Sequence, residues 1–374
     1  MRFKTLLPLV LLLSLLFSVV AQAQDDESEY VDECAAVDTM ETEDTTEEME
    51  APDNSDFTFY IILPNARGDR SFIDSAAAGA ERAIAELGVE GVIVETAGVQ
   101  EHDAAIRRAV QEEPDLVITI GIDAAIIEEI VDEFPDQLFA AQETFFPATP
   151  DYDNLALFNI LTHENSYLAG VAAGMLSRTG KVGAVGGLDS PGINLFIYGY
   201  EEGVMSVCPE CEVVTSYVGG SNPYSDPIRG KEIALGMFDE GADIIYQVAG
   251  RSGEGVLEAA SETENLAIGV DSNQDDLFPG TVLVSAMKRV DNAVFSFIET
   301  TLNEEFVPGE TRVGMPEGFA GLSWDLGICS RTFDEYGPED QVEMLPEVRM
   351  AIAEAREAIA AGDVVVTNAL EISE

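Results

Sequence analysis

From residue 57 to residue 302 the sequence alternates short apolar runs with longer stretches whose apolar residues recur at helical spacing, and this alternation restricts the fold most. A run such as 116–120 has the length of a buried strand, and a stretch such as 71–87 has the period of a helix. Strands that alternate with helices form a mostly parallel sheet with helices on both faces. The expected strands are 57–63, 92–96, 116–120, 138–142, 155–160, 182–185, 213–218, 244–248, 267–270 and 281–285.

The strand–helix pattern restarts after Thr162, so the sequence predicts two α/β lobes of similar build. A chain of 374 residues is long enough for two domains of ordinary size. We expect a helix at 290–302, directly after the strand at 281–285, and a last helix at 345–361.

Two N-terminal segments are expected to lie outside the fold. Residues 1–23 have the pattern of a secretory signal peptide, with basic residues before an apolar run and the cleavage site Ala21-Gln22-Ala23. No cysteine directly follows that site, so we expect no lipid anchor. Residues 24–56 contain fifteen acidic residues and no Lys or Arg. This composition predicts a disordered spacer, because it offers too little apolar surface to bury.

The chain is strongly acidic, with 71 acidic and 18 basic residues and a net charge of −53 at pH 7. Such a protein repels nucleic acid and anionic membranes, so neither is an expected partner. The favoured interpretation is a solvated acidic surface suited to high salt or an acidic medium. Storage of cations is the alternative, but no loop has the D-x-D-x-D-G spacing of a calcium site.

Two of the four cysteines form the motif Cys208-Pro209-Glu210-Cys211. In an exported protein such a pair is expected to be oxidised. The motif precedes the strand at 213–218, at the end of the sheet opposite any ligand site, which favours a structural disulfide over a redox centre. A zinc site would need a second pair of ligands nearby. Whether Cys34 and Cys329 pair stays open.

A parallel α/β sheet binds ligands outside the carboxyl ends of its strands. The loops from strand to helix at 64–70, 121–124, 186–192, 249–253, 271–276 and 286–289 should therefore line a cleft between the two lobes. Their aromatic, carboxylate and ammonium groups suit a neutral ligand with a flat ring and hydroxyl groups. The residues presented there are Asp69, Ser71, Phe72, Asp123, Phe196, Gly250, Arg251, Ser252, Asp271, Asn273, Gln274 and Lys288.

The stretch from residue 160 to residue 203 resembles the basic membrane protein family of solute-binding proteins, whose best-known members bind purine nucleosides for ABC importers. Small residues run through its first helix and indicate close packing against a neighbour. The resemblance extends from about residue 57 to residue 292. The residues that carry it are Ser166-Tyr167-Leu168-Ala169-Gly170, Gly183 to Gly187, Phe196, Gly199-Tyr200 and Gly203.

This resemblance implies a two-lobe type I periplasmic binding protein fold with a three-segment hinge. It implies a ligand held between the lobes, an ABC permease and ATPase as partners, and no enzymatic activity. We expect a monomer without a cofactor, either periplasmic or secreted. The first lobe is expected to comprise 57–160 and 275–318, and the second 161–274 and 319–374.

The resemblance also implies roles for single residues. Phe72 and Phe196 would stack on the two faces of a purine, and Asp123 would contact the base. Asp271 and Lys288 would hold the ribose hydroxyls. The family's asparagine after the phenylalanine is Ile73 here, and Arg251 begins the segment that matches a glycine-threonine-glycine turn. A sugar or an anionic metabolite is therefore the alternative ligand, and ligand sensing for a membrane receptor is the alternative function.

Most of these residues also have a purely structural interpretation. Phe72 and Phe196 could belong to the core, and Gly250 could serve only its turn. Asp69 and Asp123 could cap helices, and Asp271 and Lys288 could form an ion pair that needs no ligand.

Catalytic patterns are missing from the sequence. The two histidines, His102 and His163, have no placed nucleophile beside them, and no G-x-S-x-G, P-loop or H-E-x-x-H motif occurs. His102 lies in a charged helix and is expected at the surface.

Overall fold

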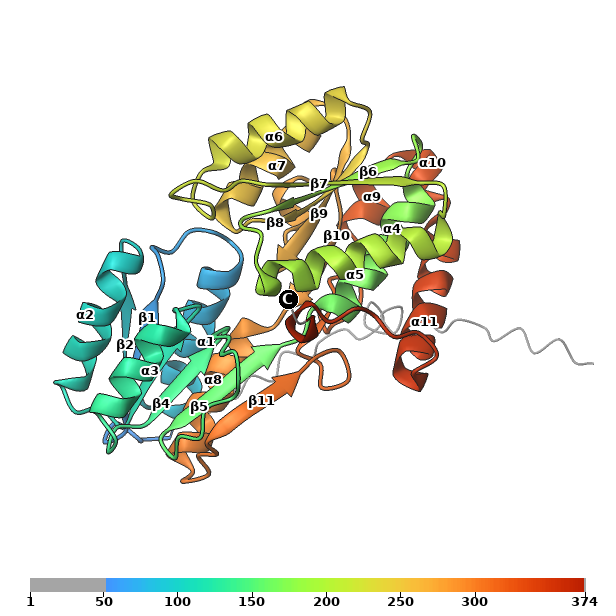
Figure 1. Ribbon diagram of the computed structural model, residues 1–374. Coiled ribbons are helices and arrows are strands. Elements are labelled where there is room, and N and C mark those ends of the chain that lie inside the picture. Colours follow the sequence, from blue (N-terminus) through green and yellow to red (C-terminus); the bar gives the residue numbers. More distant parts are fainter. Residues whose placement is uncertain (1–51, 373–374) are drawn as a thin grey trace, which may run out of the picture. The chain divides into compact units, whose positions relative to one another are not determined.

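The computed structural model describes residues 52–372. The expected signal peptide at 1–23 and most of the expected spacer at 24–56 lie outside these residues. The described chain forms two six-stranded sheets, with strand orders β11-β5-β4-β3-β1-β2 and β12-β10-β9-β8-β6-β7 (Figure 1). Neighbouring strands are parallel except for β10 and β12. Within 52–372, no helix combines the length and the apolar character that a membrane span requires.

The first sheet has helices on both faces. Its inner strands β3, β4 and β5 are buried along their whole length, as expected for parallel strands covered on both sides, whereas the edge strands β2 and β11 are partly exposed. Helices α1 (Phe72–Leu87) and α8 (Val290–Leu302) share one core with this sheet. Helices α2 (Val99–Val110) and α3 (Ala124–Glu133) share the core on the other face. The strands are β1 (Thr58–Leu63), β2 (Glu90–Glu95), β3 (Leu116–Ile120), β4 (Phe139–Gln142), β5 (Leu155–Ile160) and β11 (Gly309–Val313).

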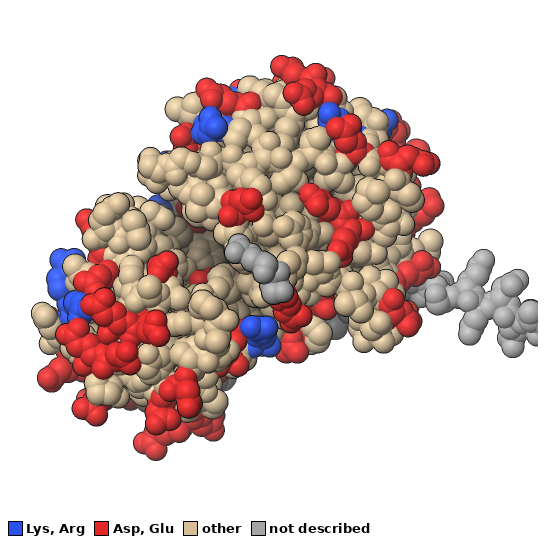
Figure 2. All heavy atoms as spheres, viewed as in Figure 1, with Lys and Arg blue, Asp and Glu red and all other residues tan. Residues whose placement is uncertain are grey.

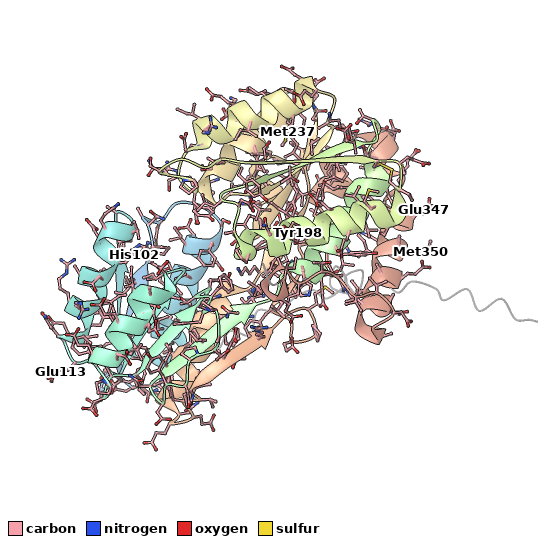
Figure 3. All side chains as sticks on the ribbon, in the orientation of Figure 1. His102, Glu113, Tyr198, Met237, Glu347 and Met350 are labelled. Atoms are coloured by element: carbon pink, nitrogen blue, oxygen red, sulfur yellow. A yellow bond between two sulfur atoms is a disulfide. The ribbon has the colours of Figure 1, made fainter. Side chains whose placement is uncertain are left out.

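The second sheet repeats this arrangement. Helices α4 (His163–Leu176), α5 (Pro191–Val207) and α11 (Leu345–Ala361) pack on one face. Helices α6 (Pro227–Asp239) and α7 (Arg251–Glu262) pack on the other, where Met237 is labelled in Figure 3. The strands are β6 (Lys181–Gly186), β7 (Glu212–Tyr217), β8 (Ile244–Val248), β9 (Leu266–Asp271), β10 (Val282–Lys288) and β12 (Ala320–Leu322).

Helices α4 and α5 pack at close range, as the small residues in this stretch predicted. A Cβ atom on Gly170 would lie 2.2 Å from the carbonyl oxygen of Tyr200, and one on Gly203 would lie 2.0 Å from that of Tyr167. Both distances are shorter than any non-bonded contact, so only glycine fits at these positions.

The position of β10 differs from the prediction. Residues 275–318 were expected in the first lobe, but Val282–Lys288 pairs with β9 in the second sheet. The later parts of this segment do belong to the first lobe, since α8 packs on the first sheet against α1 and β11 pairs with β5. The prediction was wrong for the strand because an apolar run looks the same in either sheet. The chain thus passes between the sheets after β5, at Arg289, and between β11 and β12.

Cys208 and Cys211 form a disulfide between α5 and β7, with their Cα atoms 5.3 Å apart. The bridge precedes β7 and so lies at the amino end of that strand, away from the carboxyl ends. Cys329 also takes part in a disulfide. Cys34 lies outside the described residues.

His102 is not at the surface as expected. It lies on α2 (Figure 3), is 6% exposed, and its Nε2 lies 3.0 Å from the carbonyl oxygen of Pro64. The charged residues of this helix face solvent, while His102 turns toward the first strand–helix loop. The helix period alone did not distinguish these two faces.

Acidic side chains are spread over the face shown in Figure 2, with few basic ones among them. The three lysines in the described part of the chain each pair with a glutamate: Lys181 with Glu212, Lys231 with Glu258 and Glu262, and Lys288 with Glu143. The first two pairs are largely solvent-exposed on the glutamate side, whereas the third is buried.

Candidate functional site

Lys288 is the charged centre of the candidate site. It is the last residue of β10 and is 3% exposed, and its Nζ lies 2.7 Å from Oε2 of Glu143. Glu143 directly follows β4, and its other carboxylate oxygen accepts from the Ile160 amide at 3.4 Å. Because β10 and β4 belong to different sheets, this buried ion pair joins the carboxyl ends of the two.

Two aromatic rings lie near the same ammonium group. Nζ of Lys288 is 5.2 Å from the ring centroid of Phe72 and 5.3 Å from that of Phe196. Phe72 is the first residue of α1, and Phe196 lies in the second turn of α5. The structure therefore brings together the two phenylalanines that the sequence predicted to face one ligand. Each contact is of the cation–π type and contributes about 0.5–2 kcal/mol, depending on desolvation.

Asp271 is the second buried carboxylate of the site. It ends β9, is 7% exposed, and accepts a hydrogen bond of 2.5 Å from Oγ of Ser71 in the first lobe. Burial raises the pKa of Asp271 to about 6, although the charge of Lys288 and the bond from Ser71 act in the opposite direction. The sequence left open an ion pair between Asp271 and Lys288. In the structure the ion-pair partner of Lys288 is Glu143 instead.

Asp271 and Glu143 share an unusual backbone conformation. Their φ angles are +62° and +55°, in the left-handed region that residues other than glycine rarely adopt. Such strain is typical of functional sites, where the surrounding structure holds a side chain in a required direction.

Asp69 serves as a helix cap. It is 4% exposed, and its carboxylate accepts from the amides of Ser71, Ile73 and Asp74 at 3.0–3.1 Å. Burial raises its pKa. Three backbone amides at the start of α1 therefore occupy the oxygens that were predicted to face the ligand.

Asp123 also caps a helix. It is exposed and accepts from the Ala125 amide at 2.9 Å, at the start of α3. For Asp69 and Asp123 the structure thus shows the capping that the sequence left open.

The loop before α7 contributes a turn. Gly250 has a φ of +54°, which favours glycine, and Arg251 is exposed. Oγ of Ser252 accepts from the Asp226 amide at 2.8 Å and donates to the carbonyl oxygen of Pro223 at 2.9 Å, so this side chain fastens a neighbouring loop.

Gln274 links the two lobes from the loop after β9. Its Nε2 donates to the carbonyl oxygen of Arg70 at 3.1 Å, and its Oε1 accepts from the Val270 amide at 3.0 Å and from Nε2 of Gln247 at 2.6 Å. These bonds hold the Asp271 loop against the start of α1.

Sequence reasoning missed two residues at the end of β4. Glu143 pairs with Lys288, and Gln142 is fully buried with no partner for its side-chain amide. The loop after β4 leads to another strand, so the search through strand–helix loops passed over it. The only signal was two long polar residues directly after an apolar run.

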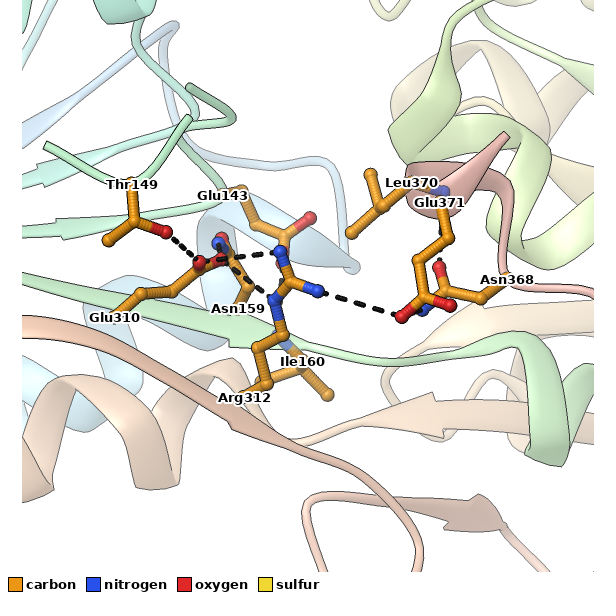
Figure 4. Close-up of polar contacts among 9 residues, drawn as sticks. All are labelled: Glu143, Thr149, Asn159, Ile160, Glu310, Arg312, Asn368, Leu370 and Glu371. Carbon is orange, nitrogen blue, oxygen red and sulfur yellow. Dashed lines mark hydrogen bonds and ion pairs between the residues drawn. The ribbon is translucent and has the colours of Figure 1, made fainter. Parts of the chain in front are cut away.

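A polar network lies beside the site, where β5 and β11 end (Figure 4). Glu310 accepts from Asn159 Nδ2 at 2.8 Å, Thr149 Oγ1 at 2.7 Å and Arg312 Nε at 3.0 Å. Arg312 also lies 3.8 Å from Glu371 near the C-terminus. The C-terminal segment is bonded to α5 of the second lobe through Thr367 and Glu202, so the network connects segments from both lobes.

His163 begins α4 next to this crossing and is 7% exposed. Burial lowers its pKa, against the charges of Glu371 and Glu202. Burial thus favours the neutral form of the histidine at the point where the chain enters the second lobe.

Comparison with known proteins places this fold and site in context. Residues 58–344 match the family model described as "ABC transporter substrate-binding protein PnrA-like". The chain is 31% identical over 285 residues to Basic membrane protein D of Borreliella burgdorferi, covering 75% of this chain and 82% of that protein. It is 30% identical over 309 residues to an uncharacterized lipoprotein of Pyrococcus furiosus, covering 76% of each.

A solved structure agrees with this match. The structure is an ABC transporter solute-binding protein from Aeropyrum pernix, which is 26% identical, with a TM-score of 0.72 over 83% of this chain and 93% of that chain. The predicted two-lobe type I periplasmic binding protein fold is thereby confirmed. The family model and this structure both describe substrate-binding proteins, and the chain belongs to the family of PnrA-like ABC transporter substrate-binding proteins.

Proposed function

We propose that the protein is the extracytoplasmic binding component of an ABC importer and captures a nucleoside, or a similar ring-bearing small molecule, between its two lobes. One observation carries this proposal. Two phenylalanines from different lobes lie within 5.2 and 5.3 Å of a single buried ammonium group. An aromatic pair beside a lysine and a buried aspartate matches a ligand with a flat ring and hydroxyl groups.

The ring of such a ligand would enter between Phe72 and Phe196. Stacking of a base on aromatic side chains is worth about 1–3 kcal/mol. Asp271 would accept from the ligand's hydroxyl groups and Lys288 would donate to them, at about 1.5–3 kcal/mol for each charge-assisted bond.

Binding would be coupled to hinge motion, because the ligand contacts groups on both lobes. Ser71 already bonds to Asp271, and Gln274 to the carbonyl oxygen of Arg70, across the same boundary. A ligand that contacts both lobes would stabilise the conformation in which the lobes are close together. The closed form would then be delivered to the permease. Absence of a lipid anchor stays a prediction, since one relative is named a lipoprotein.

A thermal-shift screen with nucleosides, free bases, sugars and amino acids in high salt tests the ligand class. A ligand at one hundred times its Kd should stabilise the protein by about 2.7 kcal/mol. A shift with adenosine, guanosine or inosine is the expected result. A shift with sugars or anions alone would mean that the protein binds a different class of ligand.

Variants then test the pocket. Phe196→Ala and Asp271→Ala should each weaken binding more than roughly tenfold, since each removes one of the contacts estimated above. Tyr336→Ala is the control, because this residue is 57% exposed and lies away from the site. Its backbone is next to Gly280, which precedes the amino end of β10, whereas the site is at the carboxyl ends of the strands. Unchanged affinity in both pocket variants would reject this site.

A further inference from the structure

Gln142 is a buried polar side chain without a partner. It is the last residue of β4 and is 0% exposed, yet neither its Oε1 nor its Nε2 makes a hydrogen bond. Within residues 52–372 it is the only buried side-chain amide for which both atoms are unpaired. Leaving a buried amide unpaired costs free energy, so such a group is unusual in a folded protein and calls for an explanation.

Strand geometry shows on which face the Gln142 side chain lies. Gln142 is paired in register with Ile120 and Phe158, and it is two residues from Ala140 on the same strand. All three neighbours belong to the core beneath α1 and α8. Because side chains alternate along a strand, the Gln142 side chain lies on that face too.

Phe72 packs on the same core. The Gly121 amide donates to the carbonyl oxygen of Gln142 at 2.8 Å, and a Cβ atom on Gly121 would lie 3.3 Å from the Phe72 ring. The next residue after Gln142 is Glu143, which pairs with Lys288. Gln142 is therefore a near neighbour, through its backbone, of two features of the candidate site.

Three carboxylates of the first lobe near the site are already engaged. Asp69 and Asp123 cap helices. Asp74 accepts from the amides of Gly68 and Arg70, each at 2.8 Å. Gln142 thus remains as a first-lobe side chain with free donor and acceptor capacity.

We propose that the Gln142 amide reads the polar edge of the ligand's ring, an inference that rests on the proposed function. A side-chain amide presents a donor and an acceptor side by side and can rotate to exchange them. It is complementary to a ring edge that carries an adjacent donor and acceptor, as the 6-amino and 6-oxo purines do. A ring without a substituent at that edge leaves part of the amide unpaired.

Gln142→Met tests this inference, because methionine has a similar shape and no amide. Inosine and purine riboside, which lacks the 6-oxo group, are the probes, and calorimetry gives their Kd values. The wild-type protein should bind inosine roughly tenfold more tightly than purine riboside, as expected for one good pair of hydrogen bonds. The variant should lose roughly tenfold in inosine affinity and bind the two probes about equally.

The ligand-free proteins supply a second measurement. Gln142→Met should keep or raise the melting temperature, because it removes an unpaired buried group. Gln247→Met is the matched control, since Gln247 is equally buried but bonded to Gln274, and its melting temperature should fall.

Three outcomes would overturn the inference. If the Gln142→Met protein keeps both the inosine affinity and the preference over purine riboside, Gln142 does not read the ring, and the proposed function stands. If its melting temperature falls as far as that of Gln247→Met, the amide is bonded within the protein. If the wild-type protein binds neither probe nor any other nucleoside, the proposed function fails and the inference with it.

Discussion

Replacement of Lys288 by methionine measures how strongly its ion pair with Glu143 holds the two sheets together. Both side chains are buried, at 3% and 9% exposure, and the charged atoms are 2.7 Å apart. At an effective dielectric constant of about 20 their attraction is roughly 6 kcal/mol, against which stands the cost of desolvating both charges. Lys288→Met leaves the Glu143 carboxylate buried without its counter-charge. We expect it to lower the free energy of unfolding by about 3–5 kcal/mol.

Urea unfolding of the ligand-free protein measures this loss. The series comprises the wild type, Lys288→Met, Glu143→Gln and the double variant. Because the double variant removes both charges, it should recover most of the loss, with a coupling free energy of at least about 2 kcal/mol between the two sites. Lys181→Met is the matched control, since its partner Glu212 is 63% exposed, and it should cost at most about 1 kcal/mol.

Unfolding in high salt distinguishes the buried ion pair from the exposed one. A buried pair is screened much less than an exposed one, so the loss in Lys288→Met should persist in high salt. The reasoning fails if Lys288→Met costs no more than Lys181→Met. It also fails if the losses of the two single variants simply add in the double variant.

Two further predictions concern pH and packing. Because burial raises the pKa of Asp271 from 3.8 to about 6, its contribution to folding is present below pH 3.8 and is lost as the pH rises to about 6. Asp271→Asn should remove this pH dependence. Unfolding free energies measured from pH 4 to pH 7 should therefore show the variant gaining up to about 3 kcal/mol of stability relative to the wild type. If the stability of the two proteins changes with pH in the same way, the raised pKa of Asp271 is contradicted. Gly203→Ala should lower stability by about 1–3 kcal/mol or more, because its Cβ would meet the carbonyl oxygen of Tyr167. Gly236→Ala in α6 is the comparison, because no atom lies within 4 Å of a Cβ at that position, and it should raise stability by about 0.5–1 kcal/mol. Equal melting temperatures for Gly203→Ala and Gly236→Ala would refute the packing argument.

The strand and helix order was predictable because buried parallel strands are continuous apolar runs, and β3 is a clear example. The same rule pointed to the carboxyl ends of the strands, where Phe72, Phe196, Asp271 and Lys288 do lie together. The sheet to which β10 belongs was not predictable, because all seven of its residues are buried and local periodicity carries no information about distant partners.

The finer parts of the site depend on side-chain direction. Asp69 and Asp123 precede helices, a position that suits both a cap and a ligand contact, and only the structure shows the bonds to backbone amides. Glu143 escaped notice because its loop leads to a strand. Its φ is +55°, and nothing in the residue type indicates such a conformation or the ion pair with Lys288.

The three passages of the chain between the sheets bear on how this protein acquires its structure. The first sheet needs β11, at residues 309–313, beside β5, at residues 155–160, and it also needs α8 on one face. The second sheet needs β12, at residues 320–322, beside β10. Neither sheet can be completed until synthesis has passed these late segments, and many contacts join residues far apart in sequence, which slows folding. The two lobes should therefore become stable together, late in synthesis, and neither is a fragment that can be cut from the sequence as one continuous piece.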